Sequence, residues 1–374
     1  MKIFTHVKKL DDSKLHEKFK FLRDNCQVRC EKELLESWTD GMVDKDKKMV
    51  REFQKSFHSC FFFFFLYKLF KQANFDIDQS HQMPDFIITN PVPFYVEAVV
   101  SNIKDGGNKE TERTVEDQFA LMLPPYVYEQ FYVDLDESIT RHANSIQHKL
   151  KKYKGNYIKL KWVDTNAPYV VALSSYDQIN YGREYIYSMV ALLYGLYYDA
   201  GSDFFYKRDS IKKPGTDSDI PLGIFVNDAL KEDYCDVSAI IFTCSLTLGK
   251  LTSLVISQGG NSLNKVYNIR KYENKYVVQT VSVDCPELLE DGIFIFHNPN
   301  ARNVLDEKAF LGTSVTQFYF DGQQLKLQGN ETPLIARHNT SILLEEISWR
   351  YVQECVRLYN RLTPEDFYDS SVVI

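Results

Sequence analysis

Two acidic residues interrupt an apolar stretch at residues 83–102, and they constrain the fold more than any other feature of the chain. The stretch contains two β-rich runs, residues 86–89 and 94–100, separated by a turn with two prolines, which predicts a β-hairpin. Asp85 opens the first run and Glu97 lies in the middle of the second. A carboxylate within an apolar strand is costly unless it is paired or holds a cation. The fold must therefore provide a partner for Glu97.

The elements around this hairpin follow a regular order. A helical pattern over residues 47–73 becomes strongly apolar across five consecutive phenylalanines, which predicts a core helix packed on more than one side. Residues 74–78 predict a short strand before the hairpin. A helix follows over residues 136–153, with apolar residues at spacings of three and four, and residues 168–174 predict a buried strand. The expected order is therefore helix, three strands, helix, strand.

The rest of the chain adds elements on both sides of this core. Residues 1–46 predict an N-terminal helical extension whose second helix is broken by Gly41, and residues 47–250 predict an α/β core. Residues 251–374 predict a C-terminal extension with strands, a hairpin at an Asp-Gly turn and a closing helix. The expected fold class is α/β, as an α+β arrangement with a mixed sheet.

Composition limits the partners of the chain. The formal net charge of −7 excludes a surface that is basic throughout, so nucleic-acid binding would need a local basic patch. The most apolar run, residues 60–66, is far shorter than the ~20 residues of a bilayer span, so no membrane partner is expected. Seven scattered cysteines and an N-terminus without an apolar signal core favour a reducing, cytoplasmic location.

The hairpin also predicts a chemistry. Side chains alternate across a strand, so Tyr95, Glu97 and Val99 share one face. If the two strands pair in register, Asp85 approaches Glu97 across the ladder. Two carboxylates and the backbone carbonyl of Ala98 would form an oxygen-rich pocket suited to Mg²⁺ or Mn²⁺. Because such a metal activates a bound water and neutralises phosphate charge, the pocket predicts metal-assisted phosphodiester hydrolysis.

A short motif accompanies this order of elements. It consists of Pro84-Asp85 and, after a gap, Glu97-Ala98-Val99. Over residues 47–175 the chain thus resembles the PD-(D/E)xK nuclease superfamily of restriction-endonuclease-like folds. The resemblance implies an αβββαβ core in which the Asp and the Glu bind the metal, the next residue offers its carbonyl, and a lysine activates the attacking water.

The chain departs from the family motif at two places. Val99 stands where the family has its lysine, and an aliphatic side chain can neither orient a water nor stabilise a charged phosphate. Residues 61–65 lack the acidic residue that the family often carries on its first core helix. Some members place the lysine on the helix after the Glu strand, where the candidates here are Gln147, Lys149 and Lys151.

The end of the same predicted helix is rich in lysine. The residues expected to contact phosphates are Lys149, Lys151, Lys152 and Lys154. The alternative is a solvated helix end whose lysines complement the helix dipole. The expected partner is nucleic acid, with DNA favoured over RNA, and a homodimer would supply two sites for cutting both strands of a duplex.

Three functional hypotheses remain open at this level. The first is a Mg²⁺-dependent endonuclease. The second is a catalytically degenerate nuclease fold that acts as a nucleic-acid- or protein-binding module, which Val99 favours. The third is an unrelated α/β protein in which Asp85 caps a turn and Glu97 forms a buried ion pair with Arg141 or a helix lysine.

A second polar residue follows an apolar strand, at His297. Asn298 and Pro299 come directly after it. The pattern favours a histidine that caps the Asn-Pro turn over a histidine that serves a site.

Overall fold

The computed structural model describes residues 1–8, 10–103, 106–176, 179–322 and 324–368, and the chain divides into two compact units. Unit 1 consists of Met1–Gln82, Ser245–Asp291 and Leu334–Ile374, and unit 2 consists of Met83–Cys244 and Gly292–Pro333. The chain therefore passes between the units after residues 82, 244, 291 and 333, and not after residues 46 and 250, where the sequence suggested boundaries.

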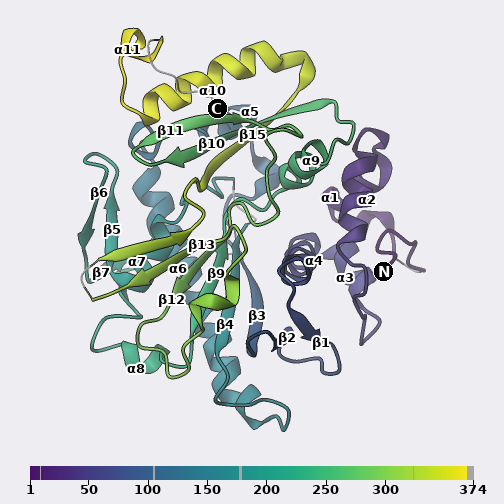
Figure 1. The fold of residues 1–374 in the computed structure, drawn as a ribbon, viewed down its shortest axis with the longest axis vertical. Helices are drawn as coiled ribbons and strands as arrows, with labels where there is room; N and C mark the ends of the chain where they lie inside the picture. Colours follow the sequence, from purple (N-terminus) through teal and green to yellow (C-terminus); the bar gives the residue numbers. More distant parts are fainter. Residues whose placement is uncertain (9, 104–105, 177–178, 323, 369–374) are drawn as a thin grey trace. The chain divides into compact units, whose positions relative to one another are not determined.

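A mixed sheet runs through unit 2 (Figure 1). Its strands lie side by side in the order β2 (Phe86–Asn90), β3 (Phe94–Ser101), β4 (Tyr169–Ser175), β9 (Ala239–Thr243), β12 (Phe294–His297), β13 (Thr316–Phe320) and β14 (Leu325–Gly329). Strands β3, β4 and β9 are parallel, as are β12 and β13, whereas the pairs β2–β3, β9–β12 and β13–β14 are antiparallel. The expected α/β class with a mixed sheet is confirmed, and so is the hairpin of β13 and β14.

Helix α6 (Phe131–Gly155) is the crossover between β3 and β4 and packs on both strands. It contains the predicted helix and begins five residues earlier. Ile139, Ile146 and Leu150 are buried on its sheet-facing side. Helix α7 (Tyr187–Tyr194) is buried along its whole length and packs against α6. The smaller elements of unit 2 are α5 (Val115–Ala120), α8 (Lys231–Tyr234) and the hairpins β5 (Leu196–Asp199) with β6 (Phe204–Lys207) and β7 (Ser210–Lys212) with β8 (Asp219–Pro221).

Unit 1 combines helices with a second sheet. The helices are α1 (Glu17–Asp24), α2 (Arg29–Ser37), α3 (Met49–Lys55), α4 (Phe57–Gln72), α9 (Leu248–Ser257), α10 (Glu345–Tyr359) and α11 (Pro364–Tyr368), and β1 (Asp76–Asp78) is a short strand. The sheet has the order β11 (Lys275–Thr280), β10 (Asn264–Tyr272), β15 (Leu334–Ser341), and α10 contacts all three strands. The sequence pattern did not predict this sheet.

The phenylalanine-rich segment forms part of the core of unit 1. Phe61 and Phe65 are buried, and both rings contact the buried ring of Trp38. The prediction of a core helix is therefore confirmed. The single helix expected over residues 47–73 is wrong, because the backbone leaves the helical conformation at Ser56 and separates α3 from α4.

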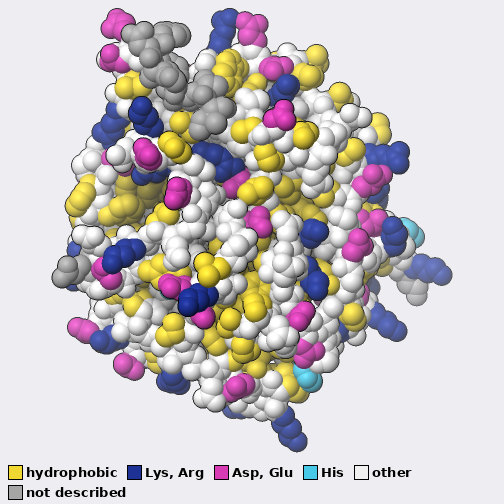
Figure 2. All heavy atoms as spheres, in the orientation of Figure 1, with side chains coloured by type: hydrophobic (Ala, Val, Ile, Leu, Met, Phe, Trp, Pro, Cys, Tyr) yellow, Lys and Arg dark blue, Asp and Glu magenta, His cyan; other side chains and the backbone are white. Residues whose placement is uncertain are grey.

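The surface mixes charges of both signs. In Figure 2, Lys and Arg side chains are interspersed with Asp and Glu side chains across the visible face. In the part of the chain that the structure describes, no helix has the length and apolar character needed to cross a membrane.

Candidate functional site

Asp85 and Glu97 come together at the β2–β3 pair of unit 2. Phe86 pairs with Val96 in the antiparallel ladder, so the register places Asp85 opposite Glu97. Oδ2 of Asp85 accepts a hydrogen bond of 2.8 Å from the backbone N–H of Ala98, which fixes the carboxylate beside β3. The two acids therefore converge as the register of the hairpin predicted.

Glu97 is fully buried and is bonded through both carboxylate oxygens. Its Oε1 accepts from Nζ of Lys149 at 3.0 Å and from Nζ of Lys152 at 2.7 Å. Its Oε2 accepts from the hydroxyl of Tyr157 at 2.7 Å. The two lysines lie one turn apart near the end of α6, and Tyr157 opens the short 3-10 helix that follows. The end of α6 and the 3-10 helix after it therefore supply all three donors.

The two carboxylates have different electrostatic environments. Burial opposes the charged form of Glu97, but Lys149, Lys152 and Tyr157 outweigh burial and lower the pKa of Glu97. Burial and the negative charge of Glu97 raise the pKa of Asp85 to about 7, against the weaker opposing effects of the two lysines and the Ala98 N–H. At neutral pH Glu97 is ionised, and Asp85 is close to its titration midpoint. The two lysines therefore compensate the negative charge of Glu97 but not that of an ionised Asp85.

Among the three helix candidates, the structure brings one to the carboxylates. Lys149 is 13% exposed and contacts Glu97, whereas Gln147 and Lys151 are exposed on α6. An α-helix turns by about 100° per residue, so residues 147 and 151 share one side of α6 and residue 149 lies on another. No hydrogen bond joins Gln147 or Lys151 to Asp85 or Glu97 within the described residues.

The other lysines of the predicted phosphate-binding group also differ in their surroundings. Lys152 is 32% exposed and is bonded to Glu97. Lys154 donates to the carbonyl of Asp233 at 2.7 Å and lies 3.4 Å from the carboxylate of Asp236. Lys151 is also exposed, and no hydrogen bond or ion pair of its side chain occurs among the described residues of α6 and its surroundings.

Val99 follows Glu97 on the same face of β3 and pairs in register with Leu173 of β4. Its side chain is aliphatic, so it offers the site no polar contact. The next residue on this face is Ser101, which is buried. Polar chemistry at the centre of β3 therefore depends on Glu97 and on the residues that α6 brings to it.

A second buried network fixes the position of α6. Nη1 of Arg141 donates to the carbonyl of Ser101 at 2.7 Å, and Nη2 donates to the hydroxyl of Ser175 at 3.3 Å and lies 3.9 Å from Glu184. Nδ1 of His142 lies 3.2 Å from the hydroxyl of Ser101, and burial together with Arg141 lowers the pKa of His142 well below its usual value. Arg141 therefore anchors α6 to the ends of β3 and β4, and the alternative in which it pairs with Glu97 is wrong.

The sequence did not indicate Tyr157 as a partner of Glu97. It named Lys152 only for phosphate binding, although one hypothesis allowed an ion pair between Glu97 and a helix lysine, and such pairs are present with Lys149 and Lys152. The signal for Lys152 was present in the helical spacing, since Lys149 and Lys152 flank the buried residues Leu150 and Tyr153. Tyr157 lies beyond the end of α6, where helical spacing no longer specifies direction. No sequence signal placed its hydroxyl at Glu97.

The oxygen atoms of Asp85 and Glu97 fit a hard divalent cation in chemical type. Within the described ranges, no group of three or more His, Cys, Asp and Glu side chains is arranged to hold a metal. A cation at this site would therefore have two carboxylate ligands and complete its shell with a backbone carbonyl, such as that of Ala98, and with waters, as Mg²⁺ commonly does. The raised pKa of Asp85 is consistent with a place where added positive charge is favourable.

Comparison with known proteins yields no relative: no protein-family model matches the chain, and neither does a curated protein or a solved structure.

Proposed function

We propose that the chain is a metal-dependent nuclease that hydrolyses phosphodiester bonds at Asp85 and Glu97. The proposal includes a restriction-endonuclease-like fold, for which the support is the chain order of the elements α4, β1, β2, β3, α6 and β4. One observation carries it. The ammonium group of Lys149, on the helix after the Glu strand, lies 3.0 Å from Glu97 and supplies the cationic donor that Val99 cannot.

The proposed roles follow from the surroundings of each group. Asp85, Glu97 and the Ala98 carbonyl would hold Mg²⁺ or Mn²⁺, which supplies an activated water and neutralises phosphate charge. Lys152 and Tyr157 keep Glu97 ionised and oriented. Lys149 retains ammonium protons beyond the one donated to Glu97, and we assign these to the attacking water or to a phosphate oxygen.

A cleavage assay tests this function. Supercoiled plasmid, linear duplex DNA, single-stranded DNA and RNA are each incubated with the purified chain and Mg²⁺ or Mn²⁺. At least one polymer is cut, and Glu97→Gln lowers the rate by about 100-fold or more because it removes a charged ligand. A rate that is unchanged in Glu97→Gln would contradict the assignment and indicate a contaminating nuclease.

The lysines allow a matched comparison on one helix. Lys149→Met is expected to lower kcat by about 100- to 1,000-fold, since it removes a donor at the reacting group. Lys151→Met removes the same charge from an exposed position, so kcat is retained and binding weakens with a salt slope smaller by about one unit. Equal losses of kcat in both variants would show that Lys149 acts only through net charge.

A degenerate binding module is the second candidate, and one observation favours it. Both oxygens of Glu97 are bonded to Lys149, Lys152 and Tyr157, an arrangement that also suits a structural ion pair. This candidate requires that calorimetry detects no Mn²⁺ binding while nucleic-acid affinity persists. The preference for DNA over RNA, the homodimer and the cytoplasmic location stay predictions.

A further inference from the structure

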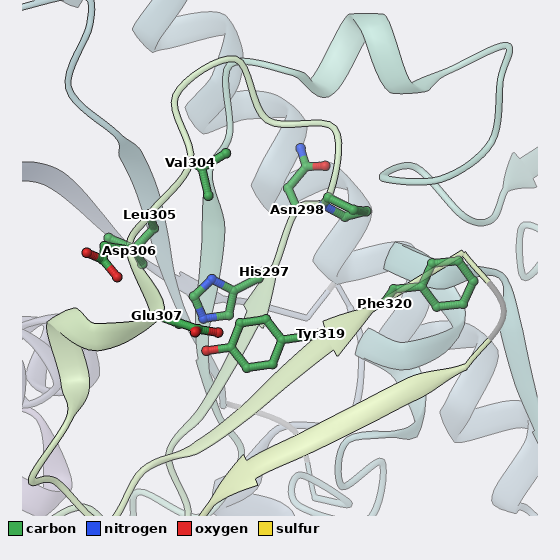
Figure 3. A pocket seen from close by; sticks show the side chains of 9 residues that line it. His297, Asn298, Val304, Leu305, Asp306, Glu307, Tyr319 and Phe320 are labelled. Carbon is green, nitrogen blue, oxygen red and sulfur yellow. The ribbon is translucent and has the colours of Figure 1, made fainter.

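A pocket of about 470 Å³ opens at the carboxyl ends of the parallel strands β12 and β13 in unit 2. Figure 3 shows the rings of His297 and Tyr319 side by side with Glu307 next to them, and Val304 on the other side of His297. The two rings are stacked, with centroids 4.3 Å apart. Phe320 also borders the pocket, but its ring projects from the opposite face of β13 and stacks on Tyr194.

The turn after β12 is held by Asn298 and not by His297. Oδ1 of Asn298 accepts from the N–H of Asn300 at 2.9 Å, and its Nδ2 donates to the carbonyl of Val237 at 2.8 Å. The prediction that His297 caps this turn is therefore wrong. His297 instead pairs with Gln317 of β13, through Nε2 at 3.0 Å.

The hydrogen bonds of Gln317 fix the proton on His297. Oε1 of Gln317 accepts from the hydroxyl of Tyr319 at 2.9 Å, and Nε2 of Gln317 donates to the carbonyl of Glu307 at 3.3 Å. Oε1 must therefore accept from Nε2–H of His297. Burial lowers the pKa of His297 despite the bond to Gln317, so the ring is neutral at pH 7. In this tautomer Nδ1 carries a lone pair and no proton.

Nδ1 of His297 is an available acceptor. Among the described residues, no group donates a hydrogen bond to it. The atom is not sealed off from solvent either, so a ligand can reach it. His297 lines the pocket. The acceptor thus contributes to the polar part of the lining.

The charged groups of the lining are acidic. Asp306 and Glu307 are exposed, and the lining that the structure describes includes no Lys or Arg. Burial and the negative charges of Glu307 and Asp306 raise the pKa of Tyr319, so both carboxylates act on the interior of the pocket. Such a lining disfavours phosphates and carboxylates, whereas a cation gains from the carboxylates and from the aromatic faces.

The sheet separates this pocket from the site at Glu97. The register connects His297 through Ala239 of β9 and Val170 of β4 to Val96 of β3, the neighbour of Glu97. Side chains alternate along strands, so His297 and Glu97 project from opposite faces of the sheet. Three strand spacings, about 14 Å, lie between their strands.

We propose that this pocket binds a small organic cation with an apolar or aromatic body. The ammonium group donates to Nδ1 of His297 and lies near Glu307 and Asp306, while the body packs against Tyr319 and Val304. The proposal does not depend on nuclease activity, because it concerns other residues on the other face of the sheet.

Binding of three matched probes to the full chain tests the proposal by calorimetry. The probes are phenethylammonium, the neutral 2-phenylethanol and the anionic phenylacetate, which share a phenyl ring and differ in charge. Phenethylammonium is expected to bind at least ~10-fold more tightly than phenylacetate, which corresponds to about 1.4 kcal/mol. The absence of saturable phenethylammonium binding, or equal affinity for phenylacetate, would overturn the proposal.

Two variants locate the probe. Glu307→Gln is expected to weaken phenethylammonium binding by about 3- to 10-fold and to leave 2-phenylethanol unchanged, because it removes charge and keeps the shape. Glu129→Gln, an exposed glutamate outside the lining, is the control and leaves both affinities unchanged. NMR shifts of the His297 ring should follow the same titration. Binding that is equally strong in Glu307→Gln, or that leaves the His297 ring unshifted, contradicts this location.

Discussion

Each unit of the molecule buries a glutamate between two cations, and the two clusters differ in access. In unit 2, Glu97 is bonded to Lys149 and Lys152, whose side chains are 13% and 32% exposed. In unit 1, Glu287 is bonded to Lys250 and Arg337, whose side chains are 2% and 4% exposed. The first cluster reaches solvent through its lysines, and the second is closed.

The clusters also differ in the acid beside the glutamate. Asp291 in unit 1 forms a bidentate ion pair with Arg270, whose Nη1 and Nη2 donate to its two carboxylate oxygens at 3.1 and 2.5 Å. Asp85 in unit 2 accepts a backbone N–H, and its pKa is raised to about 7. In unit 1 both acids are therefore paired with buried cations. In unit 2 Asp85 has no cation bonded to it among the described residues.

The comparison separates a structural ion cluster from a candidate site. Ser253 and Asn268 also bond to Glu287, at 2.5 and 3.0 Å, so its oxygens have four side-chain partners, from α9, β10 and β15 of unit 1. Burial opposes its charge, but Arg337 and Lys250 outweigh burial and lower the pKa of Glu287. Both clusters bury a charged glutamate. The Glu97 cluster differs because its lysines reach solvent and because Asp85 has no cation bonded to it among the described residues.

The largest expected effect is on stability in unit 1. Glu287→Gln leaves Lys250 and Arg337 buried without a counter-charge, which is expected to lower the free energy of unfolding by about 3–5 kcal/mol. Denaturant titration measures it. Glu346→Gln, which removes an exposed partner of Arg350, is the control with an expected loss below about 0.5 kcal/mol. A loss under 1 kcal/mol for Glu287→Gln would show that the Glu287 cluster is not a closed structural ion cluster.

The same substitution in unit 2 is expected to cost less. Glu97→Gln frees Lys149 and Lys152 to turn toward solvent, so the expected loss in the free energy of unfolding is about 1–3 kcal/mol, and the larger effect falls on cleavage. Denaturant titration of both variants under one set of conditions compares them. If Glu97→Gln destabilises as much as Glu287→Gln, both clusters are structural.

Asp85 provides a pH test. Its pKa is raised from 3.8 to about 7 by burial and by Glu97, so the folded state binds a proton that the unfolded state has released between those values. The stabilisation from this proton is complete below about pH 4 and is lost as pH rises toward 7. The stability of the wild type relative to Asp85→Asn should therefore fall across this interval. A difference that is constant with pH would place the Asp85 carboxylate away from Glu97.

The smallest effect is expected at Lys154. Its partner Asp236 is 13% exposed, but Lys154 is itself 43% exposed, so Lys154→Ala is expected to change the free energy of unfolding by less than about 1 kcal/mol. Thermal unfolding at low and high salt measures the change. A loss above 2 kcal/mol would show that surface pairs rival the buried clusters in this chain.

The parts of the candidate site that depend on the spacing of residues within one strand, hairpin or helix could be predicted from the sequence. Strand alternation and hairpin register placed Asp85 opposite Glu97, and the amphipathic helix placed α6 on β3. The choice between Gln147, Lys149 and Lys151 required the rotation of α6 about its axis. That rotation follows from Ile146 and Leu150, whose buried side chains show which side of α6 faces the sheet. The choice of Gln147, Lys149 and Lys151 as candidates did not take this side into account.

The second sheet was harder to predict because its strands carry buried polar groups. Strand β10 buries Asn268 and Arg270 as well as Ile269 between them, so residue polarity does not indicate which face of this strand is buried. The polar groups are satisfied by residues distant in the chain, such as Glu287 and Asp291. Local pattern cannot reveal such partners. The same limit hid the hydroxyl of Tyr157 from the site at Glu97.

Calorimetric titration with Mn²⁺ at pH 6 and pH 8 tests most directly whether the Glu97 cluster is a metal site. One saturable site per chain is expected, with a higher affinity at pH 8, because Asp85 must release its proton to bind the ion. The site should be lost in Glu97→Gln. Saturable binding that is unchanged in Glu97→Gln, or no saturable binding at either pH, would contradict it.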